Sequence, residues 1–166
     1  LYIDDYLLTF GENSSIAGNP GINSMIILNG VISDLGVKKL YPAGASDFTF
    51  PIGVNGKYTP ARFNVLSSDI PGSITVIPVN SKHPALYNGG TANHLDYYWY
   101  VKSTGFSNPI VQQTFYYNNN DVSGDEGTFV AGRYYQYSWT PTYQPSDNTI
   151  NIVNNTINIL PTGGVN

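Results

Sequence analysis

A strict alternation of apolar and polar residues marks the clearest predicted strand in the chain, at residues 95–101. One face of this strand carries Leu95, Tyr97, Trp99 and Val101, and the other carries Asp96, Tyr98, Tyr100 and Lys102. A period of two with aromatic and β-branched residues indicates a half-buried β-strand. A similar aromatic run at residues 128–139 ends in Trp139 and predicts a second, long strand. We therefore expect Trp99 and Trp139 to lie in the core.

Shorter alternating runs predict the other core strands. The residues expected to point inward are Phe48, Phe50, Ile52, Phe63, Val65, Ile74, Val76 and Phe115. Pro51 lacks an amide hydrogen, so we expect the first of these strands to lie at a sheet edge or to end there. Asn55-Gly56 and Asn154-Asn155 predict turns. No segment has the apolar period of a helix, and strands recurring every ~8–15 residues are typical of a β-sandwich.

The first 45 residues contain apolar runs that are too short to give one topology. Residues 25–28 are apolar, and Asn29-Gly30 separates them from Val31-Ile32, which favours a hairpin. Because the flanking runs are short, a coil of solenoid-like rungs is the alternative. The fold prediction is therefore all-β: an antiparallel, immunoglobulin-like β-sandwich preceded by a small strand-rich segment, either a hairpin or solenoid-like.

This interpretation divides the chain into three parts. The strand-rich segment occupies residues 1–45 and the sandwich domain residues 46–145. A C-terminal strand and a linker occupy residues 146–166. The chain begins in what reads as mid-strand and ends in the linker-like PTGGVN, so we expect it to be a piece of a larger polypeptide.

Composition narrows the class of function. Charged residues make up only 11% of the chain, against ~25% in average proteins, and hydroxyl and amide side chains supply the polar surface. This balance is common in extracellular β-proteins and unusual in cytosolic enzymes. The net charge is -4 and the seven Lys and Arg residues are scattered. We expect no nucleic-acid partner, because duplex binding needs several phosphate contacts at once.

Two features are missing from the sequence. Without cysteine, the chain has no disulfide, no Cys-ligated metal and no thiol nucleophile. There is also no run of ~20 apolar residues, so we expect no transmembrane segment.

Three motifs carry, in their order and spacing, a resemblance to a known family. They are DFTFPIGVNGKYTPARF at residues 47–63, LDYYWYVKSTG at 95–105 and FYYNNNDVSGDEGTFVAGRYYQYSW at 115–139. Together they resemble modules of large cell-surface and secreted adhesin-like proteins of Bacteroidetes, which the type IX secretion system exports. The loop at residues 11–18 resembles the strand-rich segment that often precedes such modules. The resemblance implies an extracellular or cell-surface β-sandwich module.

The loop NNNDVSGDE at residues 118–126 is the candidate metal site. Calcium takes six to eight oxygen ligands, and Asp121, Asp125 and Glu126 can supply some of them together with backbone carbonyls. The EF-hand spacing is not met, because placing Gly124 at the sixth position puts Val130 where the final Glu should be. The alternative is a solvated turn in which Asp and Asn bond local backbone groups. We expect no required cofactor, and calcium is the one candidate metal.

Outward-facing tyrosines form the candidate ligand-binding site. Sugar rings can stack on such side chains, and the tyrosines concerned are Tyr98, Tyr100, Tyr116 and Tyr134. The alternative is cross-strand aromatic pairing, which stabilises any sandwich by ~0.2–1 kcal/mol per pair.

Catalytic motifs are missing from the sequence. Asp4 and Asp5 are adjacent, so in a strand they point to opposite faces and do not make an acid–base pair. His83 and His94 are two ligands, whereas a zinc site needs three or four, and no serine lies in a G-x-S-x-G elbow. We therefore assign no catalytic residues and expect the chain not to be an enzyme.

Two functional hypotheses follow. The first is a non-catalytic extracellular module of a bacterial surface adhesin or filament protein, which serves display, spacing or attachment. Its partners would be neighbouring modules of the same protein, with glycans and the surfaces of host or other cells as further candidates. The alternative is a carbohydrate-binding module with a structural calcium site.

Overall fold

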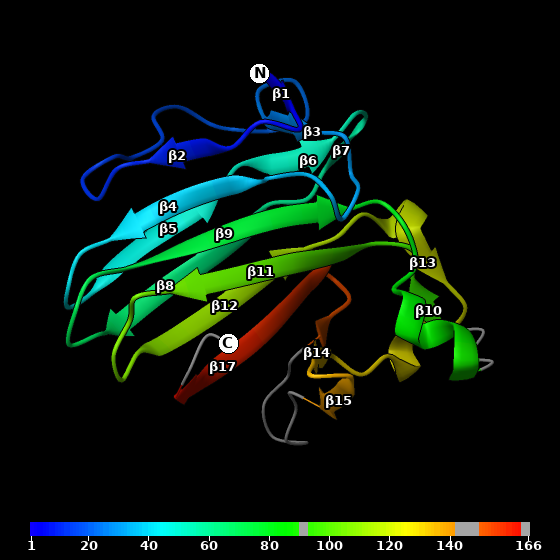
Figure 1. Ribbon diagram of the computed structural model, residues 1–166. Helices are drawn as coiled ribbons and strands as arrows, with labels where there is room; N and C mark the ends of the chain where they lie inside the picture. The colour runs from blue at the N-terminus through cyan, green and yellow to red at the C-terminus, as the bar shows by residue number, and fades with distance from the viewer. Residues whose placement is uncertain (90–92, 142–149, 164–166) are drawn as a thin grey trace.

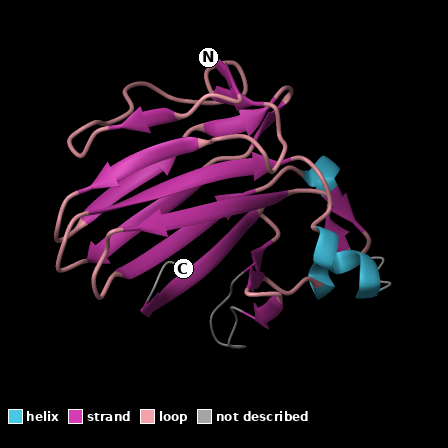
Figure 2. Ribbon diagram, viewed as in Figure 1, coloured by secondary structure: helices cyan, strands magenta, loops and turns pink. Residues whose placement is uncertain are grey.

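The structure is a computed structural model that describes residues 1–89, 93–141 and 150–163. Strands form two main sheets, a third sheet of four short strands and two two-stranded sheets (Figure 1). Helical structure in this part of the chain is limited to short 3₁₀ segments (Figure 2), namely η1 at Pro84–Gly89, η2 at Asn119–Asp121 and η3 at Glu126–Thr128. The all-β prediction is confirmed. Among the described residues, no helix has the length and apolar character needed to cross a membrane.

Four strands form the first main sheet, in the order β11-β9-β4-β2. Their bounds are Leu8–Phe10 for β2, Val37–Tyr41 for β4, Gly72–Val79 for β9 and Tyr98–Thr104 for β11. β4 pairs antiparallel with β9, and β9 antiparallel with β11. β2 pairs in parallel with β4, and both lie in residues 1–45, the segment predicted to be either a hairpin or solenoid-like.

Five strands form the second main sheet, in the order β16-β17-β12-β8-β5. Their bounds are Ser46–Phe50 for β5, Ala61–Ser67 for β8, Ile110–Tyr116 for β12, Ile150–Asn151 for β16 and Thr156–Gly163 for β17. All neighbours in this sheet are antiparallel. β5 is an edge strand that ends immediately before Pro51, as predicted.

Side chains from the main sheets form one buried cluster. It includes, as predicted, Phe48, Phe50, Ile52, Phe63, Val65, Ile74, Val76 and Phe115. Phe50 and Phe115 both meet Phe63 edge to face, each with ring centroids 5.7 Å apart, a geometry that adds to the stabilisation from burial. Trp99 packs against this core, and its indole N–H donates to the Thr59 carbonyl at 3.0 Å. The core position predicted for Trp99 is confirmed.

A third sheet joins the beginning of the chain to this core, in the order β1-β3-β6-β7. The strands are β1 at Tyr2–Asp4, β3 at Ile26–Leu28, β6 at Ile52–Val54 and β7 at Lys57–Tyr58. β3 pairs in parallel with β1 on one side and with β6 on the other. The hairpin considered at Asn29-Gly30 is therefore not formed, whereas Asn55-Gly56 does join the antiparallel pair β6 and β7. The parallel pairs agree with the solenoid-like alternative.

The chain reaches the three sheets by winding as a coil. We call residues 25–51 the second coil. In this coil β3 lies in the third sheet, β4 in the first main sheet and β5 in the second main sheet, and the next strand, β6, pairs with β3 again. Residues 1–24 are the first coil, in which β1 lies beside β3 and β2 beside β4. The buried Lys39 ammonium donates to the carbonyls of Gly11 and Glu12, at 2.5 and 2.7 Å, and so ties the loop that closes the first coil.

Strands on both sides of the predicted boundary at residue 45 contribute to the same core. Ile3, Val37 and Tyr41 belong to the buried cluster that also contains Phe63 and Phe115. At the other boundary, β17 pairs with β12 along the second main sheet, so it is a strand of the sandwich. Residues 146–149 and 164–166 of the predicted C-terminal part lie outside the described residues.

The prediction of one long strand at residues 128–139 is wrong. This run contains a hairpin of β14, Gly132–Tyr135, and β15, Ser138–Pro141. The two loop residues, Gln136 and Tyr137, have φ values of 48° and 63°, as a two-residue hairpin turn requires. Trp139 is 39% exposed, so its predicted core position is also wrong.

The strand predicted at residues 95–101 is interrupted. β10, His94–Leu95, pairs with β13, Val122–Ser123, and β11 begins only at Tyr98. The bend falls at Asp96, whose amide donates to the Asp121 carbonyl at 2.8 Å. This bond turns the chain away from β9 and toward the acidic loop.

Candidate functional site

An aromatic cluster on the surface is the main grouping of chemically distinctive side chains. We define it as His83, Tyr98, Tyr134 and Trp139. The His83 ring lies 4.8 Å from Tyr98, 4.8 Å from Tyr134 and 5.0 Å from Trp139, measured between ring centroids. Tyr134 and Trp139 are cross-strand partners in the β14–β15 hairpin, with centroids 5.1 Å apart. The cluster therefore fastens that hairpin to the edge strand β11.

His83 is the centre of this cluster, and its environment favours the neutral ring. Burial lowers the pKa of His83 below its ordinary value. The Ala85 amide donates to Nδ1 at 3.2 Å, which requires that nitrogen to be unprotonated. The ring thus offers an apolar face to the surrounding aromatic side chains at neutral pH.

The structure brings together only part of the predicted tyrosine platform. Tyr98 and Tyr134 meet across His83. Tyr100 lies two positions from Tyr98 on the same strand and is 41% exposed, but the Lys102 ammonium sits 5.1 Å from its ring centroid. Tyr116 lies on β12 in the other main sheet, away from this cluster.

Two cluster members were missed at the sequence level. His83 lies in the loop that follows β9, well before Tyr98 in the chain, and no pattern connects it to the hairpin. Trp139 would have been placed beside Tyr134 if the Gln136-Tyr137 turn had been recognised. That turn contains no Gly or Asn, the residues that usually adopt positive φ.

Exposed aromatic surface extends from the cluster along the hairpin. Tyr134 is 36% exposed and Trp139 39%, and Tyr135 on the opposite face of the hairpin has Arg133 5.8 Å from its ring centroid. Tyr137 projects from the turn and is 95% exposed. Rings with one face free and a hydroxyl or N–H at the rim can stack on a flat apolar surface and donate hydrogen bonds beside it.

The three carboxylates of the acidic loop have separate protein partners. Asp121 is buried and accepts a hydrogen bond from the Lys57 ammonium. Asp125 accepts from the Gly127 amide at 3.0 Å, and Glu126 accepts from the Tyr117 hydroxyl. Across residues 1–89, 93–141 and 150–163, no three His, Asp or Glu side chains gather closely enough to hold a metal ion.

Calcium is therefore expected to leave the thermal stability of the chain unchanged. A site that bound calcium in the native state would raise the melting midpoint with calcium concentration, but Asp121 is already neutralised by Lys57. The measurement is a thermal melt in EGTA and in millimolar calcium. Magnesium at the same ionic strength is the control, and a midpoint that rises with calcium alone would contradict this expectation.

His94, Asp96 and Ser123 lie together but not in the order of a catalytic triad. Ser123 donates its hydroxyl hydrogen to Asp96 at 2.8 Å, and Asp96 also contacts His94 Nε2 at 3.0 Å. In a triad the imidazole lies between the hydroxyl and the carboxylate, so that it can take the hydroxyl proton. Here the carboxylate takes that place, and the arrangement braces the β10–β13 pair.

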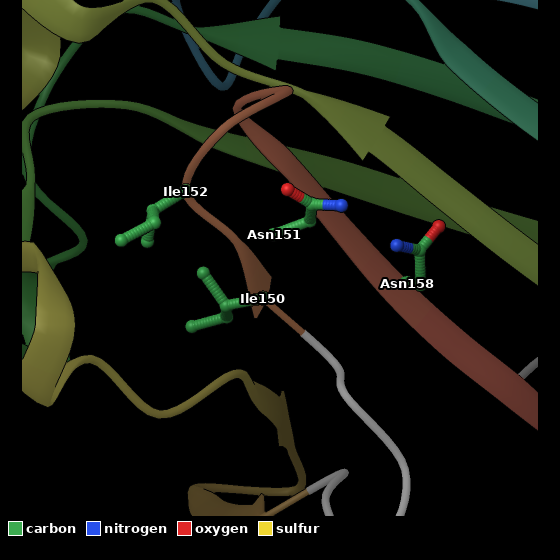
Figure 3. Close-up of a pocket in the computed structure, with 4 residues that line it drawn as sticks. All are labelled: Ile150, Asn151, Ile152 and Asn158. Atoms are coloured by element: carbon green, nitrogen blue, oxygen red, sulfur yellow. The ribbon is translucent and has the colours of Figure 1, made fainter.

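An open hollow of about 370 Å³ lies at the outer edge of the second main sheet. Its lining residues are Ile150, Asn151, Ile152 and Asn158. Figure 3 shows the two isoleucine side chains on one side of the β16 segment and the two asparagines on the other, over β17. The lining offers amide hydrogen bonds and apolar contact, but none of its four side chains titrates in the physiological range.

No protein-family model, no curated protein and no solved structure matches this chain.

Proposed function

We propose that the chain is a non-catalytic module of an extracellular surface protein, and that its work is attachment. The observation that carries the proposal is the aromatic surface at the β14–β15 hairpin, where Tyr134, Trp139 and Tyr137 are at least one-third exposed. Such residues are enriched where one protein surface binds another molecule. A low-charge, all-β scaffold and the adhesin-like motifs at residues 47–63 and 115–139 support the extracellular setting.

The proposal also covers the connectivity of the sheets, the route of export and the parent protein. An immunoglobulin-like connectivity is part of the proposal, and it is supported by two main sheets that share one buried cluster, with Trp99 packed against that cluster. Export by the type IX secretion system and a bacterial adhesin or filament as the parent protein belong to the same proposal, on the strength of the motifs.

Carbohydrate is the ligand class that the cluster favours. The apolar faces of sugar rings stack on aromatic side chains, and sugar hydroxyls accept from groups such as the Trp139 indole N–H and the tyrosine hydroxyls. The four cluster residues come from three separate segments of the chain. His83 lies immediately before η1, Tyr98 lies in β11, and Tyr134 and Trp139 lie in the hairpin. Such a constellation makes one continuous aromatic surface from residues that are far apart in sequence.

Trp139→Ala is expected to weaken polysaccharide binding at least tenfold without unfolding the protein. The measurement is affinity electrophoresis through gels that contain a panel of soluble polysaccharides, followed by titration with the polysaccharide that retards the protein. Truncating an aromatic side chain that anchors a binding surface typically costs about 2 kcal/mol or more, and about 1.4 kcal/mol corresponds to a tenfold change in affinity.

Tyr6→Ala is the matched control, because Tyr6 is 73% exposed and lies in the turn between β1 and β2, outside the cluster. Equal loss in both variants would contradict the assignment of the surface. If no polysaccharide retarded the wild-type protein, carbohydrate would be ruled out as the ligand class for the panel used, and a protein surface would become the next ligand to test.

A further inference from the structure

The end of the molecule formed by β1 and β2 is an open end of the coil. β1 is the terminal strand of the third sheet and β2 that of the first main sheet (Figure 1, near the label N). Each has a parallel partner on one side, β3 and β4 respectively. On the other side, neither strand is paired with a strand in the described part of the chain. Both edges therefore present backbone N–H and C=O groups that a further strand can bond.

Burial changes sharply between this end and the next coil. Leu8 is only half-buried, whereas its ladder partner in β4, Val37, is fully buried. Exposed apolar side chains surround the same end, and they are Leu1 at 70%, Tyr2 at 63%, Tyr6 at 73% and Leu7 at 46%. A terminal repeat that caps a solenoid has a polar outer face. At the β1–β2 end the exposed Asp4 and Asp5 are outnumbered by these four apolar side chains, so the end is less polar than the outer face of a cap.

The spacing of paired residues shows what kind of segment fits there. Tyr2 of the first coil pairs with Ile27 of the second, and Ile26 of the second coil pairs with Ile52 at the start of β6. In the third sheet the two steps along the chain, 27 − 2 and 52 − 26, differ by a single position. In the first main sheet the step from Leu8 to its partner Val37 is four positions longer than the step from Tyr2 to Ile27, so the length of a turn is set mainly by the third sheet and the loops between strands take up the difference. By the same step, a segment as long as the first coil that runs into Leu1 would place its first strand beside β1 and its second beside β2.

We propose that the β1–β2 end is the docking surface for one more coil of parallel strands that repeats the strand pairing of the first coil. The added coil would pair its strands with the open edges of β1 and β2 and would cover Leu8 and the exposed apolar side chains. This inference is independent of any ligand of the aromatic cluster.

The test extends the full chain by one coil. A second copy of residues 1–25 is joined to Leu1, with Asp4→Asn and Asp5→Asn in the copy so that like charges do not stack. Hydrogen exchange is then followed at the amides of β1 and β2. We expect exchange at the newly paired amides to slow at least tenfold and the melting midpoint to rise.

The matched control is the same extension with Ile3→Asp and Leu8→Asp in the copy. It has the same length, but it cannot bury charged side chains in the ladder, so exchange at β1 and β2 should stay at the wild-type rate. Unchanged exchange in the first extension would overturn the proposal. So would a wild-type dimer, seen by sedimentation, that Tyr2→Lys converts to a monomer, because the end would then be occupied by a second copy of the chain.

Discussion

A chain that lacks residues 1–45 is expected to lose its cooperative thermal unfolding transition. The deletion removes β4, which lies between β2 and β9 in the first main sheet, and leaves the long strand β9 with an open edge. It also removes the buried side chains of Ile3, Ile26, Leu28, Val37 and Tyr41 from the single core cluster. The remaining residues would have to form a core with one wall incomplete.

The energies involved decide this expectation. Full burial of an aliphatic or aromatic side chain is worth about 1.5–3 kcal/mol, so the five deleted side chains contribute on the order of 10 kcal/mol. The net stability of a domain is only about 5–15 kcal/mol. The loss is therefore comparable with the whole stability of the molecule.

Differential scanning calorimetry of residues 46–166 tests the point against the full chain. Far-UV circular dichroism and hydrogen exchange would accompany it, to distinguish an unfolded chain from a loosely collapsed one. A sharp heat-absorption peak in the truncated protein would contradict a shared core. It would support instead the domain boundary at residue 45 that the sequence suggested.

Lys57→Met is expected to destabilise the protein by about 3 kcal/mol, the lower end of the range for breaking a buried pair, because Lys57 itself is 28% exposed but its removal leaves the buried Asp121 charge uncompensated. The Asp121 side chain is 2% exposed, and one of its oxygens, Oδ2, has no hydrogen-bond partner among the described residues. Lys57 also donates to the Asn80 side chain at 2.7 Å, so the substitution loses a second bond. Burial raises the pKa of Tyr97, and the nearby Asp121 charge acts in the same direction, which agrees with a carboxylate in a poorly solvated site.

Arg62→Met is the matched control. Arg62 pairs with Asp47 through three short contacts, but both side chains are close to half exposed. Exposed pairs contribute about 0–1 kcal/mol, so urea unfolding should show a small loss for Arg62→Met and a large one for Lys57→Met. Equal losses in the two variants would show that Asp121 finds solvent when Lys57 is gone.

The sandwich core could be predicted because its strands follow a strong local rule. Alternation places Phe63 and Val65 on one face, and the structure buries both. The same rule also predicted the inward side of Trp99. In the longer strands, the period of two is sustained enough to identify them and the side they bury.

The coil could not be predicted by the same rule. β1, β2 and β3 have three residues each, and a short apolar run has the same pattern in a parallel and in an antiparallel pair. Asn29-Gly30 has a hairpin signature, but Asp34 accepts from the Gly30 amide at 2.9 Å and shapes the segment into a loop between β3 and β4. The local turn sequence favours a hairpin at Asn29-Gly30, but the parallel pairing of β3 with β1 and β6 determines the structure here.

The candidate sites depended on contacts between distant residues. Lys57 and Asp121 are separated by 64 positions, so no spacing argument could have assigned Asp121 to an ion pair instead of a metal ligand. The aromatic cluster likewise combines residues from three segments. Sequence patterns identified Tyr98 and Tyr134 as candidate ligand residues, and the fold supplied their neighbours.

The mixed pairing of β4 gives the molecule a direction. β4 has a parallel neighbour on one side and an antiparallel one, β9, on the other. Winding of the coil can therefore continue past β2 but not past β9, where the chain turns back on itself. Variation in length among proteins built on this plan would occur in whole turns, each similar in length to the steps from Tyr2 to Ile27 and from Leu8 to Val37. The added turns would always lie on the same side, with the sandwich acting as a fixed terminus.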